Sequence, residues 1–209
     1  TGGTGGTGGT GGTGGTVGTS TAFSIAIASK AGNPMVSRFL SDASAVSLSM
    51  DTLASLGDLS AAACDLEGDG DRDLVLGFGT GGGGSVAIWT LQNGAVVNVR
   101  TISSGSDAYR AKVGRTIPGC GDVDGDGRAE IVVGFTAAMR GLVQVFDDVG
   151  TNYAPLMTSR SYPGGYVQVP TPRKFYGSLF PAVGDIDGDG KGEVVVGMSG
   201  VRWGLIVAL

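Results

Sequence analysis

Hydrophobic residues along the chain recur in short runs that are separated by polar, glycine-rich turns. Three runs, DLVLGFG, EIVVGFT and EVVVGMS, begin at residues 73, 130 and 193. Each run is short and rich in Val, Ile and Leu, which predicts a buried strand rather than a helix. A second, glycine-led strand is expected after each run, at 84–91, 141–148 and 204–209. Helical periodicity is weak and confined to DTLASLGDL, near residue 51.

The strands belong to a repeat. The acidic motif before each run begins at residue 65, 122 or 185, so the spacings are 57 and 63 residues. Fourth strands are predicted at 95–102 and 154–162, each after a turn sequence. A unit of about 60 residues with four short strands is typical of one propeller blade. The predicted fold is all-β, with propeller-like blades of four antiparallel strands, about 3 to 3.5 of them.

The chain divides into three predicted parts. Residues 1–16 are a Thr-Gly-Gly repeat, residues 17–57 are a partial blade or closing strands, and residues 58–209 are three blades, the last incomplete. The first part is either a flexible linker or a polyproline II-like helix with three residues per turn. Such a helix would put every Thr on one edge, and this row could carry O-linked sugars or pack beside sister chains. The second part contains candidate strands at 22–29 and 35–41.

Charge and composition narrow the function classes. Thirteen of the nineteen acids fall in residues 65–73, 122–130 and 185–193, which indicates cation binding at three places. The Lys and Arg residues are scattered, so a nucleic-acid surface is not expected, and no apolar run approaches the ~20 residues of a membrane span. The absence of histidine excludes a Ser-His-Asp triad and imidazole zinc sites.

The sequence DVDGDGRAE at 122–130 explains the cation preference. Acids at loop positions 1, 3 and 5 can converge on one point, glycines let the backbone wrap, and position 7 can add a carbonyl oxygen. A carboxylate at position 9 closes the shell as the strand begins. Six to eight oxygen ligands favour Ca²⁺ over Mg²⁺, which requires a stricter octahedron.

The pattern DxDGDGxxD/E before a short apolar strand resembles the FG-GAP or VCBS-type repeat of integrin α-like β-propellers, whose outer loops hold Ca²⁺. The resemblance covers roughly residues 58–209 and implies about three Ca²⁺ ions, held where Ca²⁺ is plentiful, outside the cell or at its surface. It implies ligands at Asp65, Glu67, Asp69, Asp73, Asp122, Asp124, Asp126, Glu130, Asp185, Asp187, Asp189 and Glu193, and through backbone carbonyls at Asp71, Arg128 and Lys191.

This sequence departs from the family pattern in places. Glu67 stands where Asp is usual, which should loosen the first site, and the GAP tripeptide is degenerate. Cys64 and Cys120 precede equivalent loops, so they form either a disulfide between neighbouring repeats or buried free thiols. Thr1 in place of an initiator Met suggests a processed or partial chain.

The third blade lacks its last strand in this sequence, and an open edge invites strand pairing. The missing strand comes from the N-terminal strands of the same chain, from another chain in a homo-oligomer or filament, or from a longer protein. The leading hypothesis is a non-enzymatic, Ca²⁺-stabilised extracellular module for adhesion or for a surface or filamentous assembly through strand exchange.

Two other functions are weighed. A carbohydrate-binding propeller could use aromatic residues of the insertion at 161–180, namely Tyr162, Tyr166 and Tyr176. A polysaccharide lyase is the weaker alternative, because no catalytic Lys, Tyr and Arg group is identifiable and the acids are committed to metal. The sequence GFGTGGGGS at 77–85 is expected to link two strands rather than to bind phosphate, and Trp89 and Trp203 are expected to pack within blades.

Overall fold

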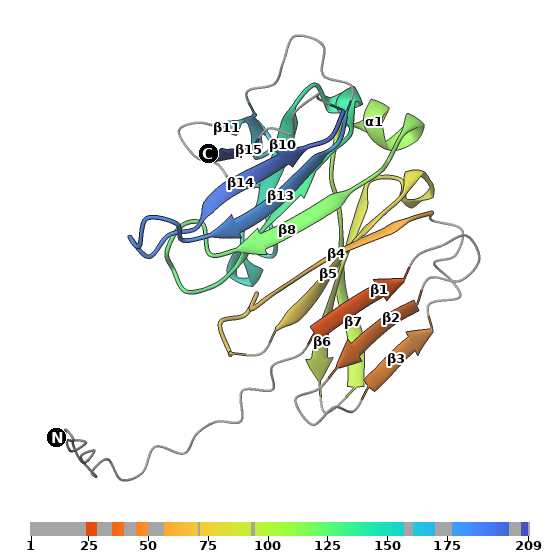
Figure 1. The fold of residues 1–209 in the computed structure, drawn as a ribbon, viewed down its shortest axis with the longest axis vertical. Coiled ribbons are helices and arrows are strands. Elements are labelled where there is room, and N and C mark those ends of the chain that lie inside the picture. The colour runs from red at the N-terminus through yellow and green to blue at the C-terminus, as the bar shows by residue number, and fades with distance from the viewer. Residues whose placement is uncertain are drawn as a thin grey trace, which may run out of the picture.

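The computed structural model describes residues 24–28, 35–39, 45–49, 57–70, 72–92, 95–156, 161–169, 177–200 and 206–208. These residues form four antiparallel sheets, which confirms the predicted all-β class with propeller-like blades (Figure 1). The described sheets do not close into a ring. Within the described part of the chain, no helix has the length and apolar character needed to cross a membrane.

The first sheet precedes the acidic repeats and has the strand order β1-β2-β3, at Ser24–Ala28, Met35–Phe39 and Ala45–Ser49. The first two strands lie inside the ranges predicted from sequence, and β3 was not predicted. Strand β1 contacts β4 of the next sheet, so this N-terminal sheet lies beside the first acidic repeat (Figure 1). The division of the chain into three parts remains a prediction.

The first acidic repeat forms blade one, a sheet of order β4-β5-β6-β7. Its strands are Leu59–Cys64, Asp73–Phe78, Ser85–Gln92 and Ala95–Ser103. All six residues of β5 are buried, as expected of a strand covered on both faces. A 3₁₀ turn at Thr80–Gly82 joins β5 to β6 within GFGTGGGGS, so these glycines link two strands as predicted.

The second acidic repeat forms blade two, with sheet order β8-β9-β10-β12-β11. Its strands are Ile117–Gly121, Glu130–Gly134, Leu142–Phe146, Tyr166–Gln168 and Ser161–Tyr162 in that sheet order. Strand β12 pairs with β10. The segment predicted as a strand at 154–162 also meets β10, at a bridge between Phe146 and Pro155, and it ends in β11, whereas residues 157–160 lie outside the described residues. Two 3₁₀ turns interrupt this blade, at Ala137–Met139 and Val149–Thr151.

The third acidic repeat forms blade three, of order β13-β14-β15, at Leu179–Gly184, Glu193–Met198 and Ile206–Ala208. The first strands of the three blades, β4, β8 and β13, lie side by side and are the main contact between blades (Figure 1). A short helix, α1 at Asp107–Lys112, precedes β8 and was not predicted. The weak helical pattern near residue 51 gives no helix at 57–59, and residues 51–56 lie outside the described residues.

The core explains why the middle strands are continuously apolar. In β9, Ile131 and Val133 face a cluster shared with blade one, whereas Val132 faces a cluster shared with blade three. Alternate residues of one strand thus pack against two different neighbours, and burial of both faces stabilises each blade only in the stack. Backbone hydrogen bonds reinforce each junction, from Thr116 N–H to the Phe78 carbonyl and from Leu179 N–H to the Phe135 carbonyl, both at 2.9 Å.

Candidate metal sites

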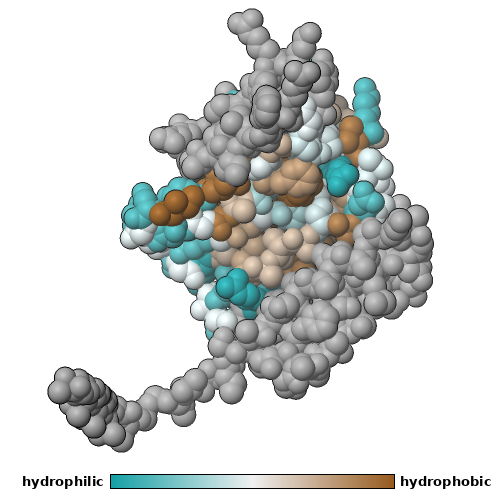
Figure 2. All heavy atoms as spheres, viewed as in Figure 1, coloured by the Kyte–Doolittle hydropathy of each residue, from teal (hydrophilic) through white to brown (hydrophobic). Residues whose placement is uncertain are grey.

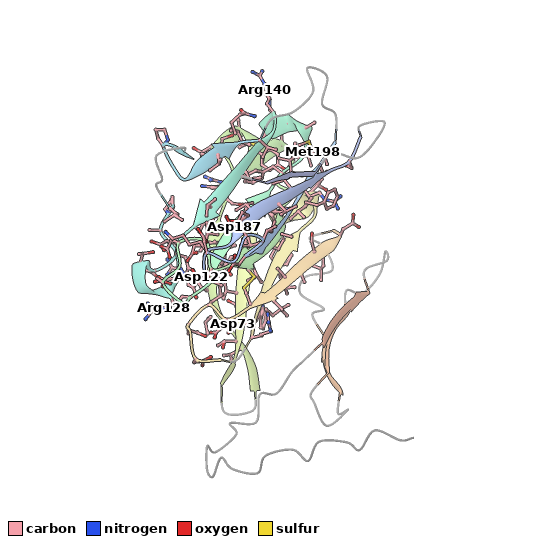
Figure 3. The ribbon with its side chains drawn as sticks, turned by 60° about the vertical axis from the view of Figure 1, so that its left-hand side comes forward. Asp73, Asp122, Arg128, Arg140, Asp187 and Met198 are labelled. Atoms are coloured by element: carbon pink, nitrogen blue, oxygen red, sulfur yellow. A yellow bond between two sulfur atoms is a disulfide. The ribbon has the colours of Figure 1, made fainter. Side chains whose placement is uncertain are left out.

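The three acidic loops connect the first and second strands of their blades, β4 to β5, β8 to β9 and β13 to β14. Because the blades stack in the same orientation, the loops gather at one end of the sheets. Figure 3 shows Asp73, Asp122, Arg128 and Asp187 at that end, whereas Met198 and Arg140 lie toward the other. Stacking therefore places like-charged loops next to one another.

The first acid of each loop holds the loop in shape. The two carboxylate oxygens of Asp65 accept the backbone N–H groups of Gly68 and Gly70, at 2.6 and 2.7 Å. These glycines have φ angles of +75° and +89°, a left-handed conformation that residues with a side chain rarely adopt. The same pair of bonds forms in the other loops, from Gly125 and Gly127 to Asp122 and from Gly188 and Gly190 to Asp185.

The ninth acid of each loop is tied to the backbone by one oxygen. Glu130 accepts the N–H of Val123 through Oε2 at 2.5 Å, and Asp73 and Glu193 accept the equivalent N–H groups of Leu66 and Ile186. Glu130 is completely buried, and its Oε1 has no hydrogen-bond partner. Burial, together with the charges of Asp124 and Asp122, raises the pKa of Glu130 to about 7. A buried carboxylate oxygen with no donor is costly unless a cation or a proton meets it.

Carboxylates converge in the second and third loops. Oxygens of Asp122, Asp124 and Glu130 all lie within 4.8 Å of one another, and so do oxygens of Asp185, Asp187 and Glu193. Two oxygens bound to one Ca²⁺ at about 2.4 Å can be no more than about 4.8 Å apart, so both groups suit a shared ion. All the donors are oxygen, which is the chemistry that Ca²⁺ prefers.

The fifth loop position does not join these clusters. Asp126 accepts the backbone N–H of Arg128 at 2.9 Å, and Asp189 accepts that of Lys191 at 2.8 Å. Both acids therefore shape the loop through turns, and their predicted role as metal ligands stays a prediction. Carbonyl ligation by Arg128 and Lys191 remains a prediction.

The first loop differs from the other two. Burial, followed by the charge of Asp73 and a hydrogen bond with it, raises the pKa of Glu67 to about 7, and burial also raises the pKa of Asp73. Two neighbouring acids that both hold protons more tightly can share one proton. No three carboxylates meet within 4.8 Å in the described part of this loop, and Asp71 lies outside the described residues.

Adjacent loops contact each other. The Asp65 carbonyl accepts the N–H of Ala129 at 2.9 Å, and the Asp122 carbonyl accepts that of Gly192 at 2.5 Å. The first position of each loop is thus bonded to the eighth position of the next. Because Asp65 and Asp122 also organise their own loops, the conformation of each loop depends on its neighbour.

Basic side chains also cross from loop to loop, which sequence reasoning missed. A Cβ placed on Gly68 would lie 3.2 Å from the Arg128 stem, and one placed on Gly125 would lie 3.1 Å from the Lys191 stem. The guanidinium of Arg128 forms an ion pair with the carboxylate of Asp148, at 3.1 Å, and Asp148 is buried. The only sequence signal was a basic residue at position 7 of loops two and three.

Two further residues near the loops were missed. The charge of Asp147 contributes to raising the pKa of Asp124, after the larger effect of burial. Tyr153 is buried, and burial followed by the charges of Glu67 and Asp73 raises its pKa to about 12. Both residues follow β10, so the end of that strand adds negative charge and an aromatic ring beside the loops. The Asp147-Asp148 pair was the available sequence signal.

Cys64 and Cys120 form a disulfide, with a Cα–Cα distance of 6.0 Å. The bond joins β4 to β8 directly before loops one and two, which decides between the two alternatives left by the sequence. Arg72 and Arg128 line a cavity of about 340 Å³ beside it. The disulfide therefore fixes the distance between the first two loops.

The aromatic residues proposed for glycan binding are only partly described. Tyr166 lies in β12, and its ring is 6.5 Å from the ring of Phe135, which is fully buried. Tyr166 thus contributes to blade packing. Tyr162 is placed by its backbone in β11, and Tyr176 and Trp203 lie outside the described residues. Trp89 is half-buried against the apolar cluster of blade one, as predicted.

Comparison with known families supports the assignment of the repeat. Residues 65–133 match the FG-GAP-like repeat. The match runs from the first acid of loop one to the middle strand of blade two, and confirms the resemblance drawn from sequence. Residues 65–133 therefore hold an FG-GAP-like repeat, within a chain of antiparallel, propeller-like sheets. A search of curated proteins gives no match.

Proposed function

We propose that this protein is a non-enzymatic, calcium-stabilised extracellular module that acts in adhesion or surface assembly. The observation that carries the proposal is Glu130 Oε1, a buried oxygen without a hydrogen-bond donor that lies in a cluster with Asp122 and Asp124. A divalent cation at this point would compensate the desolvated carboxylate and offset the repulsion among the three acids. Asp185, Asp187 and Glu193 repeat the arrangement in a more exposed setting.

The role proposed for the ion is structural. Calcium would supply positive charge that fixes each loop to the start of its second strand, while the residues of the chain orient the loop through Asp122 and Glu130. If Ca²⁺ is present at about a hundred times its dissociation constant, each site adds on the order of 2.7 kcal/mol to stability. Such sites fill where Ca²⁺ is millimolar, and the Cys64–Cys120 disulfide also favours an oxidising compartment.

The assembly role rests on the edge of blade three. Strand β15 pairs with β14 on one side, and no strand of the described part of the chain pairs with its other side. An unpaired edge can accept a strand from another polypeptide. We therefore propose that the module works by joining another chain at blade three.

Calcium titration tests the metal part of this proposal. Isothermal titration of the full chain should show saturable Ca²⁺ binding, and the thermal midpoint should fall when a chelator is added. Glu130→Gln should remove one site, because it keeps the volume but loses the charge. Asp58→Asn is the matched control, since Asp58 is an exposed acid outside the loops that pairs with Arg115, and it should bind Ca²⁺ as the wild type does. A thermal midpoint that is unchanged on chelation would contradict the structural role.

A further inference from the structure

An acid at the end of β10 lies beside the carboxylate cluster of loop two, although it is not part of that loop. Strands β9 and β10 pair so that Phe146 lies opposite Ile131. At the next position of this pairing, Asp147 lies opposite Glu130, the ninth acid of the loop. The Cβ atoms of residues opposite each other in an antiparallel pair are about 5 Å apart, so the two carboxylates start close together.

Both side chains project to the same face of blade two. Val145 of β10 and Val132 of β9 belong to the apolar cluster shared with blade three, whereas Phe146 belongs to the cluster shared with blade one. Successive residues of a strand alternate between the two faces. Asp147 follows Val145 by two residues and Glu130 precedes Val132 by two, so both acids lie on the face toward blade three.

The charge on Asp147 acts inside the cluster. Burial is the largest cause of the raised pKa of Asp124, and the charge of Asp147 adds to it with a larger effect than the charge of Asp122. Asp122 itself has an oxygen within 4.8 Å of an oxygen of Asp124. The electrostatics therefore agree with the strand pairing and place Asp147 next to the three converging acids.

Blade one shows that a side chain at this position reaches the ninth acid. The equivalent residue is Thr90, which lies opposite Asp73 in the pairing of β5 with β6. Burial raises the pKa of Asp73, and a hydrogen bond from the Thr90 hydroxyl opposes that rise. A hydroxyl stabilises the carboxylate because it donates a hydrogen bond, which the carboxylate of Asp147 cannot do. Asp147 therefore needs a cation or a proton between it and Glu130.

Asp147 and Asp148 are neighbours with different partners. Asp148 is buried, forms the ion pair with Arg128 and accepts the N–H of Gly150 at 2.7 Å. Within the described part of the chain, Asp147 accepts only the N–H of Asp148, at 2.9 Å, and pairs with no basic side chain. One oxygen of Asp147 accepts that bond, so the other stays available to a cation.

A separate observation points to a cation in this cluster. Glu130 is 0% exposed, and its Oε1 has no hydrogen-bond partner, although Oε2 is bonded to Val123. Such an oxygen is stabilised when it ligates a metal ion. Ca²⁺ takes about six to eight oxygens, so its shell has room for a carboxylate beyond those that the loop supplies.

We propose that Asp147 is a further ligand of the Ca²⁺ site in loop two, with an oxygen supplied from outside residues 122–130. Loop two then binds Ca²⁺ more tightly than loop one, where Thr90 holds the equivalent position and no three carboxylates converge in the described residues. Loop two fills before loop one as the Ca²⁺ concentration rises, and keeps its ion longer as the concentration falls. This inference deepens the calcium function proposed above and rests on it.

Asp147→Asn tests the ligand role, because the amide oxygen can still accept the N–H of Asp148 while the charge is lost. Calcium titration of the full chain, followed by NMR at the amides of Gly70 and Gly127, measures loops one and two separately. We expect the affinity of loop two to fall by about tenfold or more, and that of loop one to change by less than about twofold. Asp147→Thr, which copies blade one, should weaken loop two likewise.

Two controls separate ligation from a remote effect of charge. Asp107→Asn removes the same charge from α1, away from the loops, where Asp107 pairs with Arg110, and should bind Ca²⁺ as the wild type does (Figure 1). Figure 2 shows hydrophilic residues at the end of the sheets where the loop between β13 and β14 lies, so charges at this end are open to salt. In about 0.5 M KCl, with a Debye length of about 4 Å, a remote charge effect would largely disappear, whereas the loss caused by a missing ligand should persist.

Thermal unfolding distinguishes a ligand from a residue that stabilises the fold. In chelator, Asp147→Asn removes repulsion from the cluster, so its thermal midpoint should match or exceed that of the wild type. In millimolar Ca²⁺ the midpoint should fall below that of the wild type, because the ion is held less tightly. A lower midpoint in both conditions would show that Asp147 stabilises the fold itself, and would overturn the ligand role.

Each remaining outcome decides one part of the proposal. An unchanged affinity of loop two in Asp147→Asn, while Gly127 still reports Ca²⁺ binding, overturns the ligand role and leaves the calcium function intact. A loss of affinity that disappears in KCl overturns direct ligation. Saturation of loop one before loop two in the wild-type chain overturns the order of filling. Absence of Ca²⁺ binding at Gly127 in the wild-type chain contradicts the proposed function itself.

Discussion

The carbonyl oxygen of Asp65 accepts the backbone N–H of Ala129 at 2.9 Å, across the boundary between blades one and two. The two residues belong to neighbouring loops, so disorder in one loop removes a hydrogen bond from the other. We predict that Asp124→Asn combined with Glu130→Gln, which disables loop two, also loosens loop one. Amide exchange at Gly68 and Gly70 in Ca²⁺ should accelerate, because their acceptor Asp65 is held through Ala129.

A matched change in loop three separates coupling from general destabilisation. Asp187→Asn with Glu193→Gln should loosen loop two, through the bond from Gly192 to Asp122, and should affect loop one less. Equal acceleration in all loops for both variants would contradict coupling between neighbours.

The stability of the metal-free protein should depend on pH through Glu130. Its pKa is about 7 in the folded chain against an ordinary value of 4.5, so the folded state binds more protons between these two values. The resulting stabilisation is fully present below pH 4.5 and is lost as the pH rises through 7. The change is on the order of 3 kcal/mol for this buried group. Urea unfolding in chelator across pH 4.5 to 7.5 measures it.

Glu130→Gln is the control for this dependence of the unfolding free energy on pH. The amide does not titrate, so the unfolding free energy should fall less with pH, and the remaining slope should reflect Glu67, whose pKa is also about 7. The affinity of the wild-type chain for Ca²⁺ should increase as the pH rises over the same range, because the ion competes with the proton for Glu130. A slope that Glu130→Gln leaves unchanged would show that another group is responsible.

Loop position 2 gives a matched pair of core and surface substitutions. Leu66 is 0% exposed between blades one and two, whereas Ile186 is 64% exposed at the equivalent place in blade three. Leu66→Ala should lower the unfolding free energy by about 2–5 kcal/mol. Ile186→Ala should change it by no more than about 0.5 kcal/mol in the isolated chain. Chemical denaturation of both variants in Ca²⁺ measures the difference, and comparable losses would mean that Ile186 is covered in solution.

The disulfide should contribute independently of calcium. Cys64 and Cys120 are 56 residues apart, and a loop of that length constrains the unfolded chain by about 4 kcal/mol in the chain-entropy model. Cys64→Ala with Cys120→Ala should lower the unfolding free energy by up to that amount. The loss should be similar with and without chelator, which thermal unfolding in both conditions measures. A loss seen only in Ca²⁺ would indicate that the bond acts by positioning the loops.

The sequence was most informative where one pattern served one purpose. The loop and the buried strand are both predicted from the acids at positions 1, 3 and 9 and the apolar run that follows them. The register of this strand is set because both of its faces are buried, with Val132 on one of them. The ligand role of position 5 stays a prediction, because Asp126 accepts the N–H of Arg128 locally and is not among the acids whose oxygens converge in that loop. The disulfide could not be decided either, because its geometry depends on how β4 and β8 stack.

A local turn that the sequence did not predict precedes the strand predicted at 154–162. Asp148 accepts the N–H groups of Gly150 and Thr151 and starts a 3₁₀ turn, after which Asn152 and Tyr153 both have positive φ. After that turn Pro155 bridges Phe146 at the end of β10, and β12 pairs with the beginning of β10. Helix α1 was missed because its six residues are too few to show a period, although Ser106 caps its first turn.

The glycines of the middle strands give a matched pair of substitutions. Gly134 and Gly197 occupy equivalent positions, but only Gly134 lies against the first strand of a following blade, at the Leu179 carbonyl. Gly134→Ala should therefore force a backbone shift at the junction and lower the unfolding free energy by about 1–3 kcal/mol. Gly197→Ala has room for its methyl group and should be neutral, or stabilising by up to about 1 kcal/mol through the unfolded chain. Urea denaturation in Ca²⁺ measures both variants, and a large cost for Gly197→Ala would show that Gly197 is covered in solution.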